Sequence, residues 1–107
     1  MDFGFSETQL MLKASARGFL ESECPRSFVR AMEQDERGFT PDLWQKIAQV
    51  GWLRLPFPQE YGGEGQDFLT LCLLLEEMAR VCLPGPYFST TVLCGLPLAE
   101  FGSEAQK

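Results

Sequence analysis

Apolar residues recur at helical spacing through most of the chain, and one stretch is almost wholly apolar. The pattern predicts five helices, over about 7–22, 25–35, 41–50, 68–82 and 86–101. In the first of these, one face carries four apolar residues, Leu12, Ala16, Phe19 and Leu20. No strand-like alternation of apolar and polar residues occurs, so we expect an all-α helical bundle in a single domain over residues 1–107.

Capping residues support two of the helix starts. Ser6 and Gln9 have the types and spacing of a capping box, in which each side chain bonds the other residue's backbone amide. Thr40 is a second N-cap, placed directly before a proline. Beside it, Phe39 and Trp44 occupy the two positions of a hydrophobic staple.

The run from Phe68 to Cys82 is the most apolar part of the sequence. Asp67 is its expected N-cap, and five residues form its main apolar face, Leu71, Leu74, Leu75, Met78 and Cys82. Leu73 widens that face almost to the whole circumference, which is typical of a central helix covered on several sides.

The acidic pair in this run has an ordinary structural interpretation. Glu76 and Glu77 both have the spacing to pair with Arg80, and such pairs contribute only tenths of a kcal/mol, roughly. Neighbouring helix positions diverge by about 100°, which disfavours joint acid–base chemistry by the two carboxylates.

Prolines and glycines divide the chain between the helices. Pro56 and Pro58 restrict the residues before them, so we expect 52–57 to be extended. Glycines at 62, 63 and 65 predict a tight turn that leads into the apolar helix. Pro97 is expected to kink the last helix.

A second capping box, Ser103 to Gln106, stands one residue before the last residue given. An isolated helical turn cannot sustain itself, so we expect the chain to be the front piece of a longer one.

Charge and cysteine content limit the partners and the cellular compartment that we expect for this protein. The net charge of −6 argues against a nucleic-acid surface and against an anionic membrane surface as partner. Three of the four cysteines fall in apolar helical patterns, and Met1-Asp2-Phe3 does not open a signal peptide. These features indicate reduced thiols and a cytoplasmic protein.

Residues for self-contained catalysis are missing. The chain has no histidine, no CxxC pair and no nucleophile elbow, so we expect no catalytic residue and no metal site. The glycine-rich loop lacks the Lys-Ser/Thr of a phosphate cradle and is flanked by Glu60, Glu64 and Asp67. We therefore expect no cofactor to be bound by this chain alone.

Several segments resemble the N-terminal helical domain of the acyl-CoA dehydrogenases. They are Phe5-Ser6-Glu7-Thr8-Gln9-Leu10, Pro41-Asp42-Leu43-Trp44, Gly51-Trp52-Leu53, Pro58-Gln59-Glu60-Tyr61-Gly62-Gly63-Glu64-Gly65, Glu76-Glu77-Met78-Ala79 and Phe101-Gly102-Ser103-Glu104-Ala105-Gln106-Lys107. Their order and spacing cover nearly the whole chain.

The resemblance implies a three-domain, oligomeric flavoenzyme of fatty acid metabolism, with FAD held mostly between its other two domains. It implies an acyl-CoA thioester as substrate and a catalytic glutamate on a C-terminal bundle, outside these residues. In the family the N-terminal domain supplies one wall of the acyl cavity. By position the matching wall residues are Ser89, Val92 and Leu93, unless they are plain core. Tyr87 and Phe88 are expected either to narrow that cavity or to pack.

Two alternatives stay open at this point. The chain could be a domain of a family relative that lacks dehydrogenase activity. It could also be a stand-alone helical interaction module, because the apolar run needs more cover than four short helices give. Either a fragment or a module with such a surface is expected to associate, for instance as a dimer.

Overall fold

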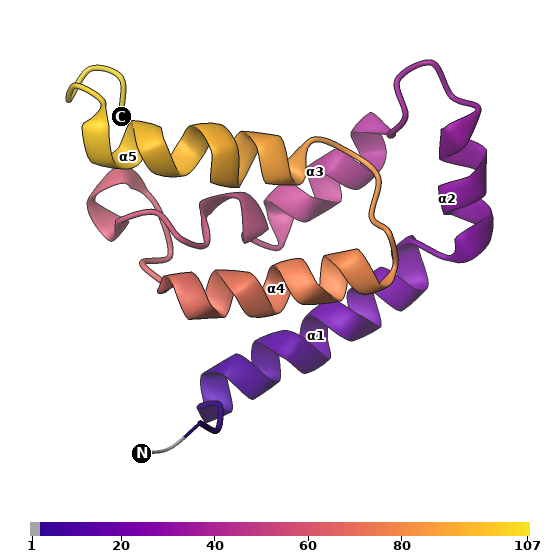
Figure 1. Cartoon of the computed structure of the whole chain (residues 1–107), viewed down its shortest axis with the longest axis horizontal. Helices are drawn as coiled ribbons and strands as arrows, with labels where there is room; N and C mark the ends of the chain where they lie inside the picture. Colours follow the sequence, from indigo (N-terminus) through magenta and orange to yellow (C-terminus); the bar gives the residue numbers. More distant parts are fainter. Residues whose placement is uncertain (1–2) are drawn as a thin grey trace. The chain divides into compact units, whose positions relative to one another are not determined.

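The structure, a computed structural model, describes residues 3–107. Met1 and Asp2, which belong to the segment used to argue against a signal peptide, lie outside the described residues. Between residues 3 and 107 the chain forms helices and turns and no strand, so the prediction of an all-α fold is confirmed (Figure 1). The elements are α1 (Glu7–Glu23), α2 (Arg26–Glu33), α3 (Pro41–Gln49), η1 (Trp52–Arg54), η2 (Gln59–Tyr61), α4 (Phe68–Arg80), η3 (Phe88–Gly95) and α5 (Leu96–Phe101).

The chain divides into two compact units. Unit 1 consists of the described residues of Met1–Gly38 together with Leu69–Pro84, and contains α1, α2 and nearly all of α4. Unit 2 consists of Phe39–Phe68 and Gly85–Lys107, and contains α3, both 3-10 turns, η3 and α5.

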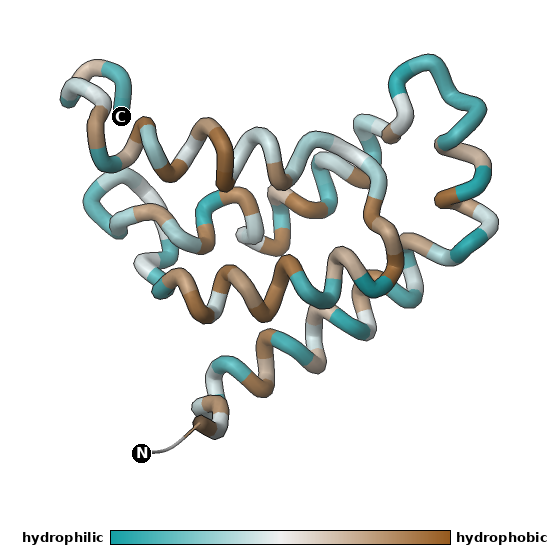
Figure 2. Tube along the Cα trace, in the orientation of Figure 1, coloured by the Kyte–Doolittle hydropathy of each residue, from teal (hydrophilic) through white to brown (hydrophobic). Residues whose placement is uncertain are grey.

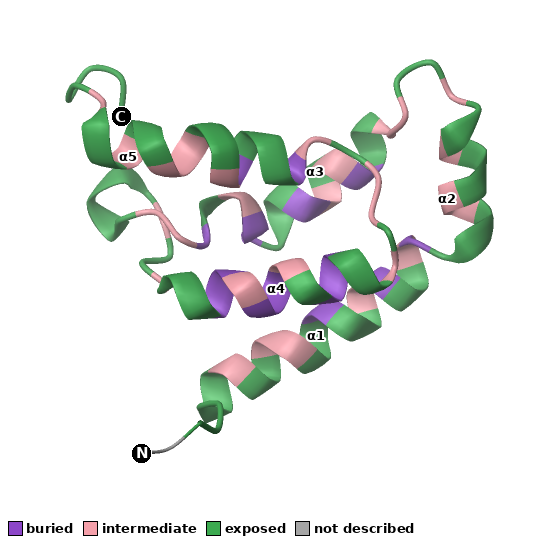
Figure 3. Cartoon of the chain, in the orientation of Figure 1, coloured by how far each residue is buried: buried purple, intermediate pink, exposed green. Residues whose placement is uncertain are grey.

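In unit 1, α1 begins as its sequence predicts. Ser6 Oγ accepts from the Gln9 amide at 3.2 Å, and Gln9 Oε1 accepts from the Ser6 amide at 3.0 Å. Ala16 and Leu20 are fully buried on the predicted face. By contrast α2 buries no residue completely, as Figure 3 shows.

The apolar helix α4 is the most buried element of unit 1. Hydrophobic residues follow one another through its first turns (Figure 2), and Leu71, Leu73 and Leu74 are at most 4% exposed. The predicted end was wrong, because α4 stops at Arg80 and leaves Cys82 exposed rather than on the buried face. The cysteine pattern was therefore misread: Cys24 is the buried thiol, while Cys82 and Cys94 are exposed.

In unit 2, α3 also begins as predicted. Thr40 Oγ1 accepts from the Leu43 amide at 3.2 Å, and the Phe39 and Trp44 rings pack edge to face with centroids 6.4 Å apart. Leu43 and Ile47 face the core of the unit.

The segment after α3 is not extended, which corrects the prediction for 52–57. Gly51 turns the chain at φ +88°, and η1 then forms a 3-10 turn. Leu55 adopts a right-handed helical conformation although Pro56 follows it. Burial of Trp52 and Leu55, 5% and 7% exposed, explains why packing overrides the local preference before proline.

The last helix widens instead of simply kinking at Pro97. Residues 88–95 form η3, a π-helical segment in which the Leu96 amide donates to the Thr91 carbonyl five residues back. Gly95 and Leu96 before it both have right-handed helical dihedral angles, so Pro97 stands within a continuous helix and cannot donate to a carbonyl of the preceding turn. The proline does break the α-helical pattern, but the irregularity lies on its N-terminal side.

Among the described residues, every helix is too short or too polar to cross a membrane.

Candidate functional site

The predicted pocket-wall residues all lie on η3. Ser89 and Leu93 are exposed, Leu93 by 61%, and Val92 is half-buried. Ser89 Oγ donates to the Pro86 carbonyl at 3.1 Å, which satisfies the hydroxyl locally. The alternative that these positions are plain core is therefore wrong for Ser89 and Leu93 within this chain.

The opposite side of the same segment is anchored in unit 2. Tyr87 is 3% exposed, and its hydroxyl donates to the Trp52 carbonyl at 2.6 Å. Burial raises the pKa of Tyr87 to about 12. Thr91, one turn later, is 1% exposed. Of the two aromatic residues considered for the cavity, Tyr87 packs inward, whereas Phe88 is 52% exposed.

The backbone amides of the glycine-rich loop donate hydrogen bonds to carbonyls of the same unit. The amides of residues 63–66 donate in turn to the carbonyls of Pro58, Arg54, Phe57 and Leu55, over 2.8–3.0 Å. A Cβ on Gly63 would lie 2.0 Å from the Phe57 carbonyl oxygen, so only glycine fits there. An ion pair between Arg54 and Glu64, 3.0 Å long, closes the loop.

This loop does not fit the diphosphate of FAD. A phosphate cradle needs backbone amides that point outward, and these four are already bonded to carbonyls. The exposed carboxylates of Glu60 and Glu64 would also repel a phosphate. The glycines here serve close packing.

A cavity of about 220 Å³ lies in unit 2, beside the glycine-rich loop. It is lined by residues from three parts of the unit, Arg54, Phe57, Pro58, Tyr61, Gly63, Gly95, Leu98, Ala99 and Lys107. At its edge the Tyr61 hydroxyl donates to Glu104 Oε2 at 2.6 Å, and Lys107 Nζ stands 5.8 Å from the Tyr61 ring centroid. The hydrogen bond from Tyr61 to the Glu104 carboxylate raises the pKa of Tyr61 to about 12. The three predicted wall residues do not line this cavity.

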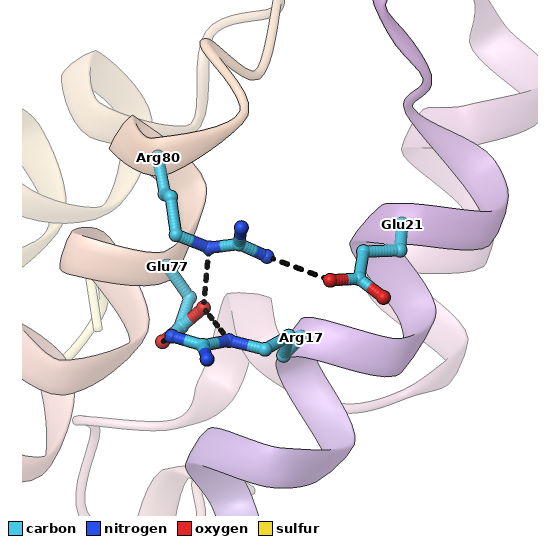
Figure 4. A network of polar contacts seen from close by, with 4 residues as sticks. All are labelled: Arg17, Glu21, Glu77 and Arg80. Atoms are coloured by element: carbon cyan, nitrogen blue, oxygen red, sulfur yellow. Dashed lines mark hydrogen bonds and ion pairs between the residues drawn. The ribbon is translucent and has the colours of Figure 1, made fainter.

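The charged groups of unit 1 form a structural network (Figure 4). Glu77 is 2% exposed and accepts from Arg17 at 2.9 and 3.2 Å and from Arg80 at 3.3 Å. Arg80 continues to Glu21 at 3.2 Å, which links α4 to α1 a second time. The hydrogen bond from Arg17 holds the pKa of Glu77 below its ordinary value.

This network corrects one prediction and confirms another. Glu77 is a buried carboxylate with two arginines and not a surface pair of the weak kind expected. Glu76 is exposed while Glu77 is buried, so the two carboxylates do diverge as predicted. Every oxygen of Glu77 is held by arginine, which leaves it no role as an acid or base.

Sequence reasoning missed the long-range polar contacts. Tyr61 with Glu104 and Tyr87 with Trp52 join residues far apart in the chain, and no local pattern indicates them. The second capping box was found: Gln106 Oε1 accepts from the Ser103 amide at 2.8 Å, and Ser103 Oγ from the Gln106 amide at 3.3 Å.

The chain matches one family model and many curated proteins. Residues 6–107 match the model described as "Acyl-CoA dehydrogenase, N-terminal domain". The short-chain specific acyl-CoA dehydrogenase of Clostridium acetobutylicum is 34% identical over 100% of this chain and 28% of its own length. The mitochondrial short-chain specific enzyme of Rattus norvegicus is 32% identical over 94% of this chain and 24% of its own.

Two solved structures share the fold. A variant of the Tcur3481–Tcur3483 steroid ACAD superposes with a TM-score of 0.84 at 33% identity, covering 94% of this chain and 27% of that one. The ChsE4–ChsE5 complex from Mycobacterium tuberculosis gives a TM-score of 0.88 at 29% identity, covering 100% of this chain and 30% of that one. The chain thus spans less than a third of the length of these relatives.

Proposed function

Because the chain belongs to the family of acyl-CoA dehydrogenase N-terminal domains, we propose that it serves an FAD-dependent enzyme that desaturates acyl-CoA thioesters between the α and β carbons. In this proposal the chain holds no catalytic group and supplies one wall of the acyl pocket. FAD and the catalytic glutamate belong to other domains of the longer enzyme, since the glycine-rich loop does not fit the flavin diphosphate.

The observation that carries the proposal is the two-sided character of η3. Its inner residues Tyr87 and Thr91 are fixed in unit 2, while Ser89 and Leu93 face outward. A wall for an acyl chain needs this combination, because an apolar surface binds the chain and a rigid backing keeps its shape. Ser89, Val92 and Leu93 are the proposed wall.

Setting and assembly follow from the same premise. We propose a cytoplasmic enzyme of fatty acid metabolism that works as a homo- or hetero-oligomer. One structural neighbour is a complex of two different proteins, which supports assembly. Twelve large apolar side chains are exposed among the described residues, which supports burial against further protein.

The test is acyl-chain selectivity in the longer enzyme. Leu93→Trp enlarges the proposed wall, and we expect kcat/KM to fall about tenfold for long acyl chains with little change for short ones, since a pocket discriminates size by roughly 1–3 kcal/mol. Gln45→Trp, at an exposed position of α3, is the matched control and should leave the chain-length profile unchanged. An equal fall in kcat/KM for all acyl-chain lengths would show that Leu93 does not line the acyl pocket.

Flavin binding is tested on the 107-residue chain. In equilibrium dialysis we expect FAD to distribute equally on both sides of the membrane. Stoichiometric retention of flavin by this chain would overturn the assignment of the cofactor site to other domains.

A stand-alone interaction module is the second candidate. Phe68 and Leu69, 61% and 51% exposed at the start of α4, are the observation that favours it. Light scattering across a dilution series is expected to show concentration-dependent association. A strict monomer at the highest concentration would count against the module.

A further inference from the structure

The end of α4 places a cysteine where glycine is the usual residue. The Leu83 amide donates to the Met78 carbonyl at 3.0 Å and the Cys82 amide to the Ala79 carbonyl at 3.1 Å, the bond pair of a Schellman motif. Cys82 takes the left-handed position with φ +55°, and it is the non-glycine residue with positive φ in the described chain. A side chain at this position is strained, so a thiol held there points to a use for the sulfur.

A second thiol stands at the end of α1. Cys24 is the C-cap residue of that helix, with its amide donating to the Leu20 carbonyl at 2.8 Å, and it is 2% exposed. Burial raises the pKa of Cys24, and the electrostatic effect of Cys82 raises it further.

Both cysteines line one cavity of about 500 Å³ in unit 1. Arg26 and Arg30, one helical turn apart on α2, line it as well, together with Arg80. Glu21 and Glu33 are the acidic residues of the lining. Arg80 is held by Glu77 and Glu21, whereas Arg26 and Arg30 suit an entering molecule with carboxylates, because guanidinium groups bind carboxylates in pairs of hydrogen bonds.

We propose that Cys24 and Cys82 are a redox-active thiol pair that closes into a disulfide when the chain meets a small carboxylate-bearing disulfide such as oxidised glutathione. The exposed Cys82 thiolate attacks one sulfur of the oxidant, and one glutathione thiolate leaves. The Cys24 thiolate then attacks the Cys82 sulfur and releases the second glutathione. The protein loses two electrons and two protons, and the oxidant becomes two glutathione thiols.

The closed form would join the ends of α1 and α4. A bridge between residues so distant in sequence restricts the unfolded chain and raises resistance to unfolding. This site lies in unit 1 and is independent of the acyl-pocket proposal.

Peptide mapping tests the pair directly. The folded, reduced Cys94→Ser chain is incubated with oxidised glutathione, alkylated and digested with trypsin, because Cys94 shares a tryptic peptide with Cys82. Before alkylation, we expect the intact mass of the oxidised chain to fall by two hydrogen atoms. After digestion, we expect a disulfide-linked pair of peptides, 18–26 with 81–107. The disulfide should raise the urea midpoint of unfolding, and reduction with dithiothreitol should restore both the starting mass and the starting midpoint.

Variants separate this pair from chance oxidation. Cys72→Ser should leave the link intact, whereas Cys82→Ser should abolish it and leave Cys24 reduced, with circular dichroism confirming the fold. A stable glutathione adduct on Cys82 with Cys24 still alkylated would overturn the proposal. A link of either cysteine to Cys72 would overturn it as well.

Discussion

The two units of this chain are stabilised in different ways. Unit 1 consists of regular helices joined by side chains, with the Glu77 carboxylate held between Arg17 and Arg80. In unit 2 backbone groups fix the glycine-rich loop, since its amides bond carbonyls and Gly63 lies against the Phe57 backbone, and one ion pair, Arg54 with Glu64, closes it. The comparison teaches that a buried ion network can add to apolar packing in one half of a helical domain while close backbone packing holds a loop in the other.

The largest expected effect is in unit 2, for Gly63→Ala. The new Cβ would lie 2.0 Å from the Phe57 carbonyl oxygen, so the loop must shift and lose the Gly65-to-Phe57 bond of 2.8 Å. We expect a loss of about 3 kcal/mol in the free energy of unfolding, measured by urea denaturation followed by circular dichroism.

The matched control lies in unit 1. A Cβ on Gly18 meets no atom within 4 Å, and the residue is inside α1. Gly18→Ala should therefore stabilise the chain by up to about 1 kcal/mol. Equal losses in the two variants would contradict the contrast between the units.

The next largest effect is in unit 1, for Glu77→Gln. The buried residue loses its charge-assisted bonds from Arg17 and Arg80, and we expect a cost of about 2 kcal/mol. Glu76→Gln, at an exposed position, is the control and should cost much less.

Acid unfolding sharpens the same contrast. The pKa of Glu77 is lower in the folded chain than its ordinary value of 4.5, so its stabilisation is present above pH 4.5 and is lost as the pH falls through the folded pKa. The wild type should lose more stability than Glu77→Gln below pH 4.5. Parallel pH profiles would show that the ion network does not stabilise unit 1.

A smaller effect is expected for Tyr87→Phe, which removes the buried bond to the Trp52 carbonyl. We expect a loss of about 1 kcal/mol in the free energy of unfolding, and a smaller loss for Tyr61→Phe, which removes the exposed bond to Glu104.

The chain has two tyrosines, both with pKa raised to about 12. Phenol absorbance should therefore stay constant through pH 10 in the folded chain. Since the pKa values of both tyrosines are raised in the folded chain, the stability that the two neutral phenols contribute is present below pH 10 and is lost as the pH rises through 12.

The smallest effect is expected for Cys82→Gly in the reduced chain. Relief of the left-handed strain exceeds the added freedom of the unfolded chain, so we expect a gain of about 0.5 kcal/mol. Ala79→Gly, within α4, is the control and should cost about 1 kcal/mol. A loss in both variants would show that Cys82 is not strained.

Prediction from sequence succeeded where the information is local. The caps at Ser6 and Thr40 and the apolar faces of α1 and α4 depend on residues a few positions apart. The π-helical segment and the helical conformation of Leu55 before Pro56 depend on packing within unit 2, which local preference does not encode.

The candidate site divides in the same way. Position in the family pattern placed Ser89, Val92 and Leu93 on one segment, and the structure finds that segment outward-facing at Ser89 and Leu93. The anchoring of Tyr87 to Trp52 joins residues distant in sequence, and the residues themselves give no signal of that pairing. Burial of Glu77 was missed because its partner Arg17 lies on another helix.

The wide turn of η3 has a consequence for how this helix can vary. Because a π-helical turn takes up about one residue more than an α-helical turn, the segment accommodates an extra residue without turning the residues on either side of it. Deleting one residue within 88–95 should therefore restore ordinary winding and leave Leu98 and Phe101 close to their present faces, with Tyr87 still in place. A single codon gained or lost changes the width of this helix and not the direction in which its C-terminal part faces.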